Sequence, residues 1–198
     1  MGYREDNMAI VNGLINTARR EYACGYEMAN GGNMSARIPG TDLMIVKGTN
    51  VGFCDVDFDS LVVTDFDGNM VEGTSRPTKE ALLHGALYKK LPELGAIMHN
   101  HSPFANAWGN KHDALEFSTL HSEFKFKVPI PVFDCPTAVV GTDYFPVICA
   151  AFDEQPQLKG FILKKHGPVG LGKTIEDAAF AAELMEETAK ISILQRLA

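Results

Sequence analysis

Apolar residues recur at helical spacing in three long stretches of the chain. Residues 8–22 place an apolar side chain every three or four positions, and Gly25 follows where helices commonly stop. Similar spacing follows Pro77 and predicts a helix that carries Glu80. The third stretch runs from Thr174 toward the last residue. The pattern therefore predicts helices near the start, the middle and the end of the chain, with a shorter helical piece at 104–108.

Short apolar runs separated by Gly, Pro, Asn and Asp predict the strands. They fall at residues 34–38, 43–46, 61–64, 94–98, 129–133 and 161–163. The dipeptide Asp67-Gly68 predicts a tight hairpin, so antiparallel pairing is expected in the first half. Strands interspersed with helices, without repeats or low-complexity linkers, predict one mixed α/β domain over residues 1–198.

Composition and charge exclude several classes of protein. The chain is 45% hydrophobic and 22% charged, which is typical of a globular protein with a core and excludes disorder. Its net charge is −7 without a basic run, so nucleic acid is not expected as a partner. No apolar stretch reaches the roughly 18 residues of a membrane helix and no leader is recognisable, so we expect a cytoplasmic protein that does not bind membranes. The four cysteines form no CxxC pair and are expected to be free thiols.

Three histidines are placed as metal ligands would be. His99 and His101 are two residues apart at the end of a predicted strand, so both rings can lie on one face. By itself this pair could equally be structural, but His166 also ends an apolar strand, directly before Gly167. If the two strands are neighbours, three imidazoles meet at one sheet edge. Three neutral imidazoles with an open position are typical of a catalytic zinc site, in which the ion can polarise a carbonyl.

Residues 167–174 also fit the phosphate-loop pattern G-x-x-x-x-G-K-S/T, with a strand before and a helix after. A nucleotide triphosphatase needs further parallel strands and an acidic magnesium ligand, and too few residues follow Thr174 to supply them. We therefore interpret the segment as a glycine-rich turn between strand and helix, with Lys173 on the surface.

Four motifs occur together in a fixed order along the chain. They are Gly32-Asn33-Met34-Ser35, Pro77-Thr78-Lys79-Glu80, His99-Asn100-His101 and His166-Gly167-Pro168. Over nearly its whole length the chain thereby resembles the class II aldolase/adducin family. The resemblance implies a three-layer α/β/α fold around a mainly antiparallel central sheet. It also implies one zinc ion per subunit on His99, His101 and His166, and a homotetramer with active sites at subunit interfaces.

The resemblance further implies a site for the phosphate of a sugar phosphate. The matching positions are Asn33, Thr49, Asn50, Thr78 and Lys79. The family often has glycine in place of Asn50 and a second serine in place of Lys79. A lysine can bind a phosphate as a point charge, or it marks a different substrate end.

Glu80 matches the acid/base carboxylate of the family's aldolases, at a position where its epimerases carry aspartate. In the aldolases such a group returns a proton to carbon after the carbon–carbon bond breaks, while the metal stabilises the enediolate. From the residue alone, the alternative is an exposed glutamate in the first turn of a helix, where the helix dipole favours it.

The second proton donor separates the branches of the family. The aldolases use tyrosines from a central segment and a C-terminal tail, whereas this chain has His121-Ser122-Glu123 centrally and no tail tyrosine. Glu123 is our candidate for the second acid. We expect a zinc-dependent aldehyde-lyase that cleaves a ketose 1-phosphate of the L-fuculose-1-phosphate type to dihydroxyacetone phosphate and an aldehyde. The alternatives are a 3-oxo-tetronate 4-phosphate decarboxylase and a pentulose-5-phosphate 4-epimerase. A non-enzymatic scaffold without metal is disfavoured because the three histidines are present.

Overall fold

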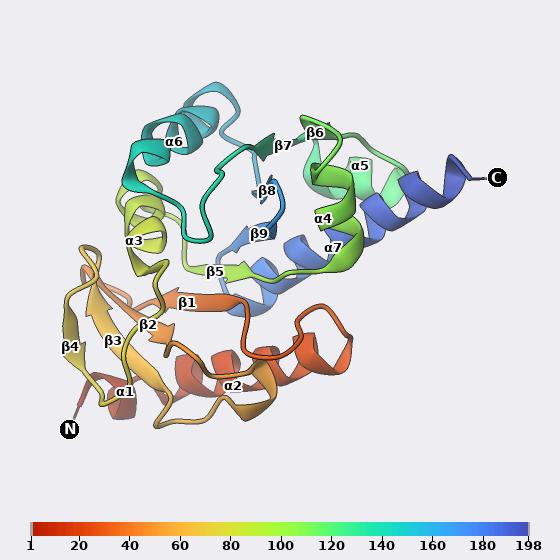
Figure 1. Ribbon diagram of the computed structural model, residues 1–198. Coiled ribbons are helices and arrows are strands. Elements are labelled where there is room, and N and C mark those ends of the chain that lie inside the picture. The colour runs from red at the N-terminus through yellow and green to blue at the C-terminus, as the bar shows by residue number, and fades with distance from the viewer. Residues whose placement is uncertain (1, 198) are drawn as a thin grey trace.

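A computed structural model describes residues 2–197 and arranges them as one sheet between two layers of helices (Figure 1). The strands are β1 (Asn33–Arg37), β2 (Leu43–Lys47), β3 (Leu61–Asp65), β4 (Met70–Glu72), β5 (Ala96–His99), β6 (Ala114–Leu115), β7 (Ile130–Phe133), β8 (Gly160–Leu163) and β9 (Gly167–Gly172). The helices are α1 (Tyr3–Asp6), α2 (Met8–Ala23), α3 (Ala81–Lys90), α4 (Pro103–Gly109), α5 (Leu120–Phe126), α6 (Phe145–Glu154) and α7 (Ile175–Gln195). The predicted opening, middle and final helices are confirmed.

The nine strands lie in the order β4-β3-β2-β1-β5-β9-β8-β7-β6. Neighbours pair antiparallel throughout the described residues except for β7 and β8, which are parallel. The expected hairpin at Asp67-Gly68 joins β3 to β4. The predicted three-layer α/β/α architecture with a mainly antiparallel sheet is confirmed.

Successive side chains along a strand point to opposite faces of the sheet, so the hydrophobic core has a part on each face. In β5, Ala96 and Met98 pack in the cluster that includes residues of α2 and α7. Ile97, between them, packs in the cluster of α3 and α6 on the opposite face. Because side chains alternate along a strand, His99 lies on the same face as Ile97. The last residue of β5 thus points to the side of the sheet where α3 begins.

The glycine-rich segment 167–172 is a strand, and our interpretation of it as a turn is wrong. It forms β9, which pairs with β5 on one side and β8 on the other. Its glycines are required because α7 lies directly on it: a Cβ on Gly170 would come 2.1 Å from the carbonyl oxygen of Ala178. The backbone N–H groups of β9 face its two neighbouring strands and are not free to bind a phosphate. The phosphate-loop alternative is therefore excluded. Lys173 is exposed, as expected.

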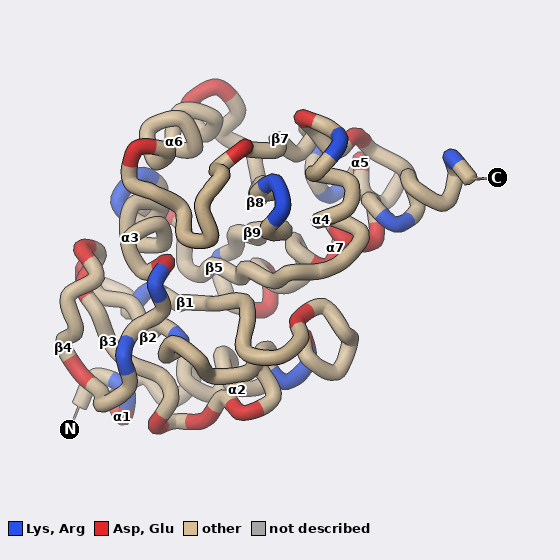
Figure 2. Tube along the Cα trace, in the orientation of Figure 1, with Lys and Arg blue, Asp and Glu red and all other residues tan. Residues whose placement is uncertain are grey.

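Positively and negatively charged residues are spread over the elements, and neither kind is gathered in one continuous stretch of the trace (Figure 2). Among the residues that the structure describes, no helix has the length and hydrophobicity needed to cross a bilayer.

Candidate active site

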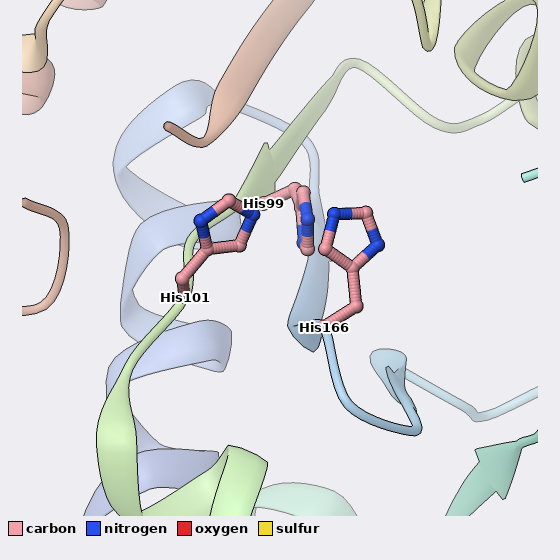
Figure 3. Close-up of side chains that lie close together, drawn as sticks. All are labelled: His99, His101 and His166. Atoms are coloured by element: carbon pink, nitrogen blue, oxygen red, sulfur yellow. The ribbon is translucent and has the colours of Figure 1, made fainter. Parts of the chain in front are cut away.

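The topology brings the three predicted metal ligands together. His99 ends β5 and stands opposite Val169 of β9, so the two strands are neighbours as the prediction required. His166 lies in the turn that connects β8 to β9, and His101 follows β5 by two residues. The ring centroid of His99 lies 4.5 Å from that of His166 and 5.1 Å from that of His101. The potential ligand atoms of all three lie within 4.8 Å of one another, and Figure 3 shows the rings converging.

The hydrogen bonds and burial of His99 suit a metal ligand. Its Nδ1 lies 2.9 Å from the carbonyl oxygen of Pro168, which can only accept, so Nδ1 carries the proton. The other ring nitrogen, Nε2, is buried and has no hydrogen-bond partner. Burial holds the pKa of His99 well below its usual 6.5, and nearby His166 and His101 act in the same direction. Burial also lowers the pKa of His166. Neutral imidazoles are the form that binds metals, so this donor set fits a divalent ion.

Glu80 lies beside this triad, immediately before the first residue of α3. One carboxylate oxygen is 4.0 Å from His99 Nε2 and the other is 3.9 Å from His166 Nδ1. The Asn33 amide donates a hydrogen bond of 3.1 Å to Oε2, and the backbone N–H of Val140 donates to Oε1. Glu80 is only 4% exposed, so the alternative of a solvated glutamate in a helix turn is wrong.

A cavity of about 160 Å³ opens beside the triad. It is lined by residues from six segments: Asn30, Gly31, Gly32, Asn33, Lys47, Thr49, Asn50, Thr78, Lys79, Glu80, His101, Ala138, Val139 and His166. All five predicted phosphate-site residues are therefore gathered around one space with Glu80 and two of the histidines. Asn50 has a φ of +60°, a backbone conformation that glycine and asparagine adopt most readily. This conformation suits asparagine here as well as the glycine that the family resemblance implies.

Lys47 lines the same cavity and was not selected from the sequence. Its side chain is 1% exposed, and its ammonium group donates to the carbonyl oxygen of Val51. Burial lowers the pKa of Lys47 to about 8, and the negative charge of Glu27 opposes that shift. The available signal was a lysine that ends the otherwise apolar strand β2, directly before Gly48 and Thr49.

Glu123 is placed away from this cavity. It lies on α5, its side chain is exposed, and it is not among the residues that line the space next to the triad. Two large apolar neighbours on the same helix, Leu120 and Phe124, are 85% and 65% exposed. Within one chain, the structure does not bring the predicted second acid to the other candidate residues.

Asn100, between the first two histidines, points to the opposite face and holds a buried carboxyl. Its amide donates a hydrogen bond of 2.7 Å to Oε2 of Glu21, which is fully buried. Burial, reinforced by the neighbouring carboxyl group of Glu183, raises the pKa of Glu21 to about 8. Glu21 is therefore largely protonated at neutral pH.

This raised pKa predicts a pH-dependent stability. Because folding raises the pKa of Glu21 from 4.5, its contribution to stability is complete below about pH 4.5 and is lost as the pH rises through about 8. Between these two pH values, the free energy of unfolding falls by at most about 1.4 kcal/mol for each pH unit. We expect Glu21→Gln to reduce the loss of unfolding free energy between pH 5 and pH 8 by at most about 3 to 4 kcal/mol. Urea denaturation at both pH values measures it, with the exposed Glu187→Gln as control; equal pH slopes in wild type and Glu21→Gln would contradict the assignment.

Comparison with known proteins decides the family. The family model described as Class II Aldolase and Adducin N-terminal domain matches residues 12–193. The chain belongs to the class II aldolase and adducin family. It is accordingly an enzyme of the class II aldolase superfamily, whose enzymes are metal-dependent, and the histidine triad is capable of holding a metal. A sugar-phosphate substrate is consistent with this family.

Individual relatives of this family member include both aldolases and epimerases. L-ribulose-5-phosphate 4-epimerase UlaF from Salmonella paratyphi C is 33% identical over 172 residues, which cover 83% of this chain and 75% of the relative. A solved L-fuculose 1-phosphate aldolase superimposes with a TM-score of 0.84 at 22% identity, covering 95% and 86% of the two chains. YgbL from Escherichia coli superimposes with a TM-score of 0.82 at 23% identity, covering 94% and 89%. The structural matches show the shared fold, and the epimerase matches the chain at least as well as the aldolase does.

Proposed function

We propose that this protein is a zinc-dependent aldehyde-lyase that cleaves a ketose 1-phosphate of the L-fuculose-1-phosphate type. The products would be dihydroxyacetone phosphate and an aldehyde. The observation that carries the proposal is the position of Glu80, whose two carboxylate oxygens lie 4.0 Å and 3.9 Å from nitrogens of two different histidines of the triad. A buried acid/base group next to a metal-binding triad is what enediolate chemistry requires.

His99, His101 and His166 would hold the ion. When bound, a zinc ion at three neutral imidazoles supplies a Lewis acid that stabilises negative charge on substrate oxygen. His99 contributes a ring orientation fixed by its hydrogen bond to Pro168.

Glu80 would transfer the proton at carbon. In the cleavage direction the second acid/base group, for which Glu123 is the candidate, takes the proton of the hydroxyl next to the scissile bond. The carbon–carbon bond then breaks, the aldehyde forms, and the electron pair of the broken bond passes into an enediolate. Glu80 then donates a proton to the carbon that has lost the aldehyde, and removes that proton in the condensation direction. Asn33 orients the carboxylate for this transfer through its hydrogen bond to Oε2.

The cavity beside Glu80 would bind the phosphate. Thr49, Thr78 and the Asn33 amide offer hydrogen-bond donors around it, and Lys79 and Lys47 offer positive charge. Lys47 is the better-placed cation because its buried side chain is held at the cavity wall, whereas Lys79 is exposed.

We therefore expect Lys47→Met to weaken substrate binding more than the chemical step. A charge-assisted hydrogen bond contributes roughly 1.5–3 kcal/mol, so KM should rise by about 10- to 100-fold with a smaller change in kcat. Steady-state kinetics with the ketose phosphate, together with inhibition by inorganic phosphate, measures the effect. Lys111→Met, an exposed lysine outside the cavity, is the control. An unchanged KM and unchanged phosphate inhibition in Lys47→Met would remove Lys47 from the phosphate site.

Glu123 would act as the second acid only from another copy of the chain. Its exposed position on α5 and the exposed apolar Leu120 and Phe124 beside it support an assembly in which α5 meets a neighbouring subunit, as in the proposed homotetramer. Sedimentation velocity tests the assembly: a monomer at assay concentration would overturn this part of the proposal.

A second candidate is pentulose-5-phosphate 4-epimerisation. It is favoured by the 33% identity to L-ribulose-5-phosphate 4-epimerase UlaF, which spans most of both chains. Glu80 supports the aldolase over this candidate, because it is the residue type that matches the family's aldolases.

Proton exchange into dihydroxyacetone phosphate separates the two candidates. We would follow its hydroxymethyl proton signals by NMR in heavy water with zinc-loaded protein, with and without a chelator. Chelator-sensitive exchange of one hydroxymethyl hydrogen is expected of the aldolase and requires no assumption about the aldehyde. A zinc-loaded protein that shows no exchange but interconverts pentulose 5-phosphate epimers would overturn the aldolase proposal in favour of the epimerase.

A further inference from the structure

A buried carboxylate that no motif indicated lies against the third histidine of the triad. Glu27 is in the loop between α2 and β1 and is only 2% exposed. Its Oε2 accepts a hydrogen bond of 2.8 Å from the backbone N–H of His101. Its Oε1 lies 3.4 Å from Nδ1 of the same histidine and accepts a bond from the backbone N–H of Met28. One carboxylate therefore contacts both the main chain and the ring of His101.

His101 is the histidine of the triad that most needs such a contact. Its side chain is 35% exposed, compared with 0% for His99 and 19% for His166. It also lies beyond the end of β5, so the ladder of the sheet does not fix its backbone. The hydrogen bond from its N–H to Glu27 supplies that restraint.

The loop closes tightly over the contact between Glu27 and His101. A Cβ on Gly31 would come 2.5 Å from Oε1 of Glu27 and 2.6 Å from Nδ1 of His101. A Cβ on Gly32 would come 2.5 Å from Oε2 of Glu27, and Gly32 has a φ of +59°. Only glycine fits at both positions. The two glycines before Asn33 therefore let the loop enclose a carboxylate and an imidazole side by side.

We infer that Glu27 is the positioning residue for the third metal ligand, and this inference rests on the metal site of the proposed function. Its carboxylate, 3.4 Å from Nδ1 of His101, favours the tautomer that carries the proton on Nδ1 and leaves Nε2 of that ring as the nitrogen available to the ion. A carboxylate behind a ligating histidine orients the ring and increases its basicity. Nδ1 of His99 faces the neutral carbonyl oxygen of Pro168, whereas Nδ1 of His101 faces the carboxylate of Glu27.

The tautomer of His101 can be measured in the native protein before any residue is replaced. In metal-free, ¹⁵N-histidine-labelled protein, long-range ¹H–¹⁵N spectra distinguish a protonated Nδ1 from a protonated Nε2. We expect His101 to carry its proton on Nδ1; the signal is assigned as the one missing in His101→Gln. A proton on Nε2 would overturn the inference, and this readout does not depend on whether a Glu27 variant folds.

Zinc affinity tests the consequence. We expect Glu27→Gln to weaken the binding of zinc alone by about 10- to 100-fold, measured by competition with a chromophoric chelator. The matched control is Glu186→Gln, which also removes a buried carboxylate that accepts two backbone N–H groups, those of Phe104 and Ala105 just after His101. Both variants lose comparable bonds to the main chain, but only Glu27 contacts a histidine ring of the triad. Glu186→Gln should keep the wild-type zinc affinity.

The outcomes separate this inference from the reaction proposed above. Wild-type zinc affinity in Glu27→Gln, or an equal loss in Glu186→Gln, would show that Glu27 only anchors the loop and would overturn the inference. A native protein that binds no zinc would overturn it together with the metal site. A protein that binds zinc, loses it in Glu27→Gln and yet shows no exchange of dihydroxyacetone phosphate would support the inference while the aldolase proposal fails.

Discussion

Replacement of His99 by alanine is expected to remove bound metal and enzymatic turnover together. His99 is the fully buried member of the triad, and its Nε2 has no hydrogen-bond partner among the described residues, so no other side chain is placed to substitute for it. Loss of the metal removes several kcal/mol of stabilisation of the developing negative charge, a decrease in kcat/KM of about 10³-fold or more. Metal analysis of the purified variant and a coupled assay with the ketose phosphate measure the two losses.

The matched control for this variant is His84→Ala. His84 is also fully buried on the same side of the sheet, where its Nδ1 lies 2.8 Å from the Ser35 hydroxyl, but it is not part of the triad. Both variants should lose thermal stability, because each removes a buried ring. Only His99→Ala should lose zinc. If His99→Ala keeps full zinc occupancy, the ligand assignment is wrong.

The sequence predicted the elements of the fold whose hydrophobic pattern is local. The short apolar runs at 34–38 and 43–46 led directly to β1 and β2, and the helical spacing from Thr174 led to α7. It did not predict β9, because glycine has low strand propensity and the reason for these glycines is the distance to α7, which no local pattern contains. The helix α6 was also not predicted, although Pro146 in its first turn is compatible with a helix start.

The residues of the candidate site also fall into those that the sequence indicated and those that only the structure revealed. The three histidines and Glu80 could be identified because motifs carry them, and the strand order then brought them together as expected. Lys47 and Glu27 could not be identified from the sequence. A single charged residue indicates a site only when the structure shows that its side chain is buried. Both belong to segments that pack around the cavity from different parts of the chain, so only the folded structure shows what they contact.

Three buried charged residues, two acidic and one basic, lie in or next to the cavity and give the site its chemical character. Glu80 and Glu27 are 4% and 2% exposed, and Lys47 is 1% exposed. Each would be costly alone in a place with little water. A divalent ion held by the histidines would balance the two carboxylates, and a substrate phosphate would balance the lysine. The arrangement is therefore suited to binding a cation and an anion next to each other, as a metal-assisted reaction of a sugar phosphate requires.

Replacement of Glu80 by glutamine should separate metal binding from proton transfer. Glutamine keeps the size of the side chain, and its carbonyl oxygen can still accept the hydrogen bond from Asn33. It cannot take or give a proton at carbon. We expect zinc occupancy to stay at the wild-type level, while kcat falls by about 10²- to 10⁴-fold and KM changes little. Exchange of the dihydroxyacetone phosphate hydrogen should fall in parallel, because it requires the same proton transfer.

Glu80→Asp and Asn33→Ala make this test specific. Aspartate keeps a carboxylate but is one methylene shorter, so its activity should lie between those of wild type and Glu80→Gln. Asn33→Ala leaves the carboxylate in place and removes the amide that orients it, so activity should fall less than in Glu80→Gln. Undiminished exchange in Glu80→Gln would show that another group moves the proton. In that case the carboxylate next to His99 and His166 would serve the charge balance of the metal site, and the acid/base residue would have to come from elsewhere.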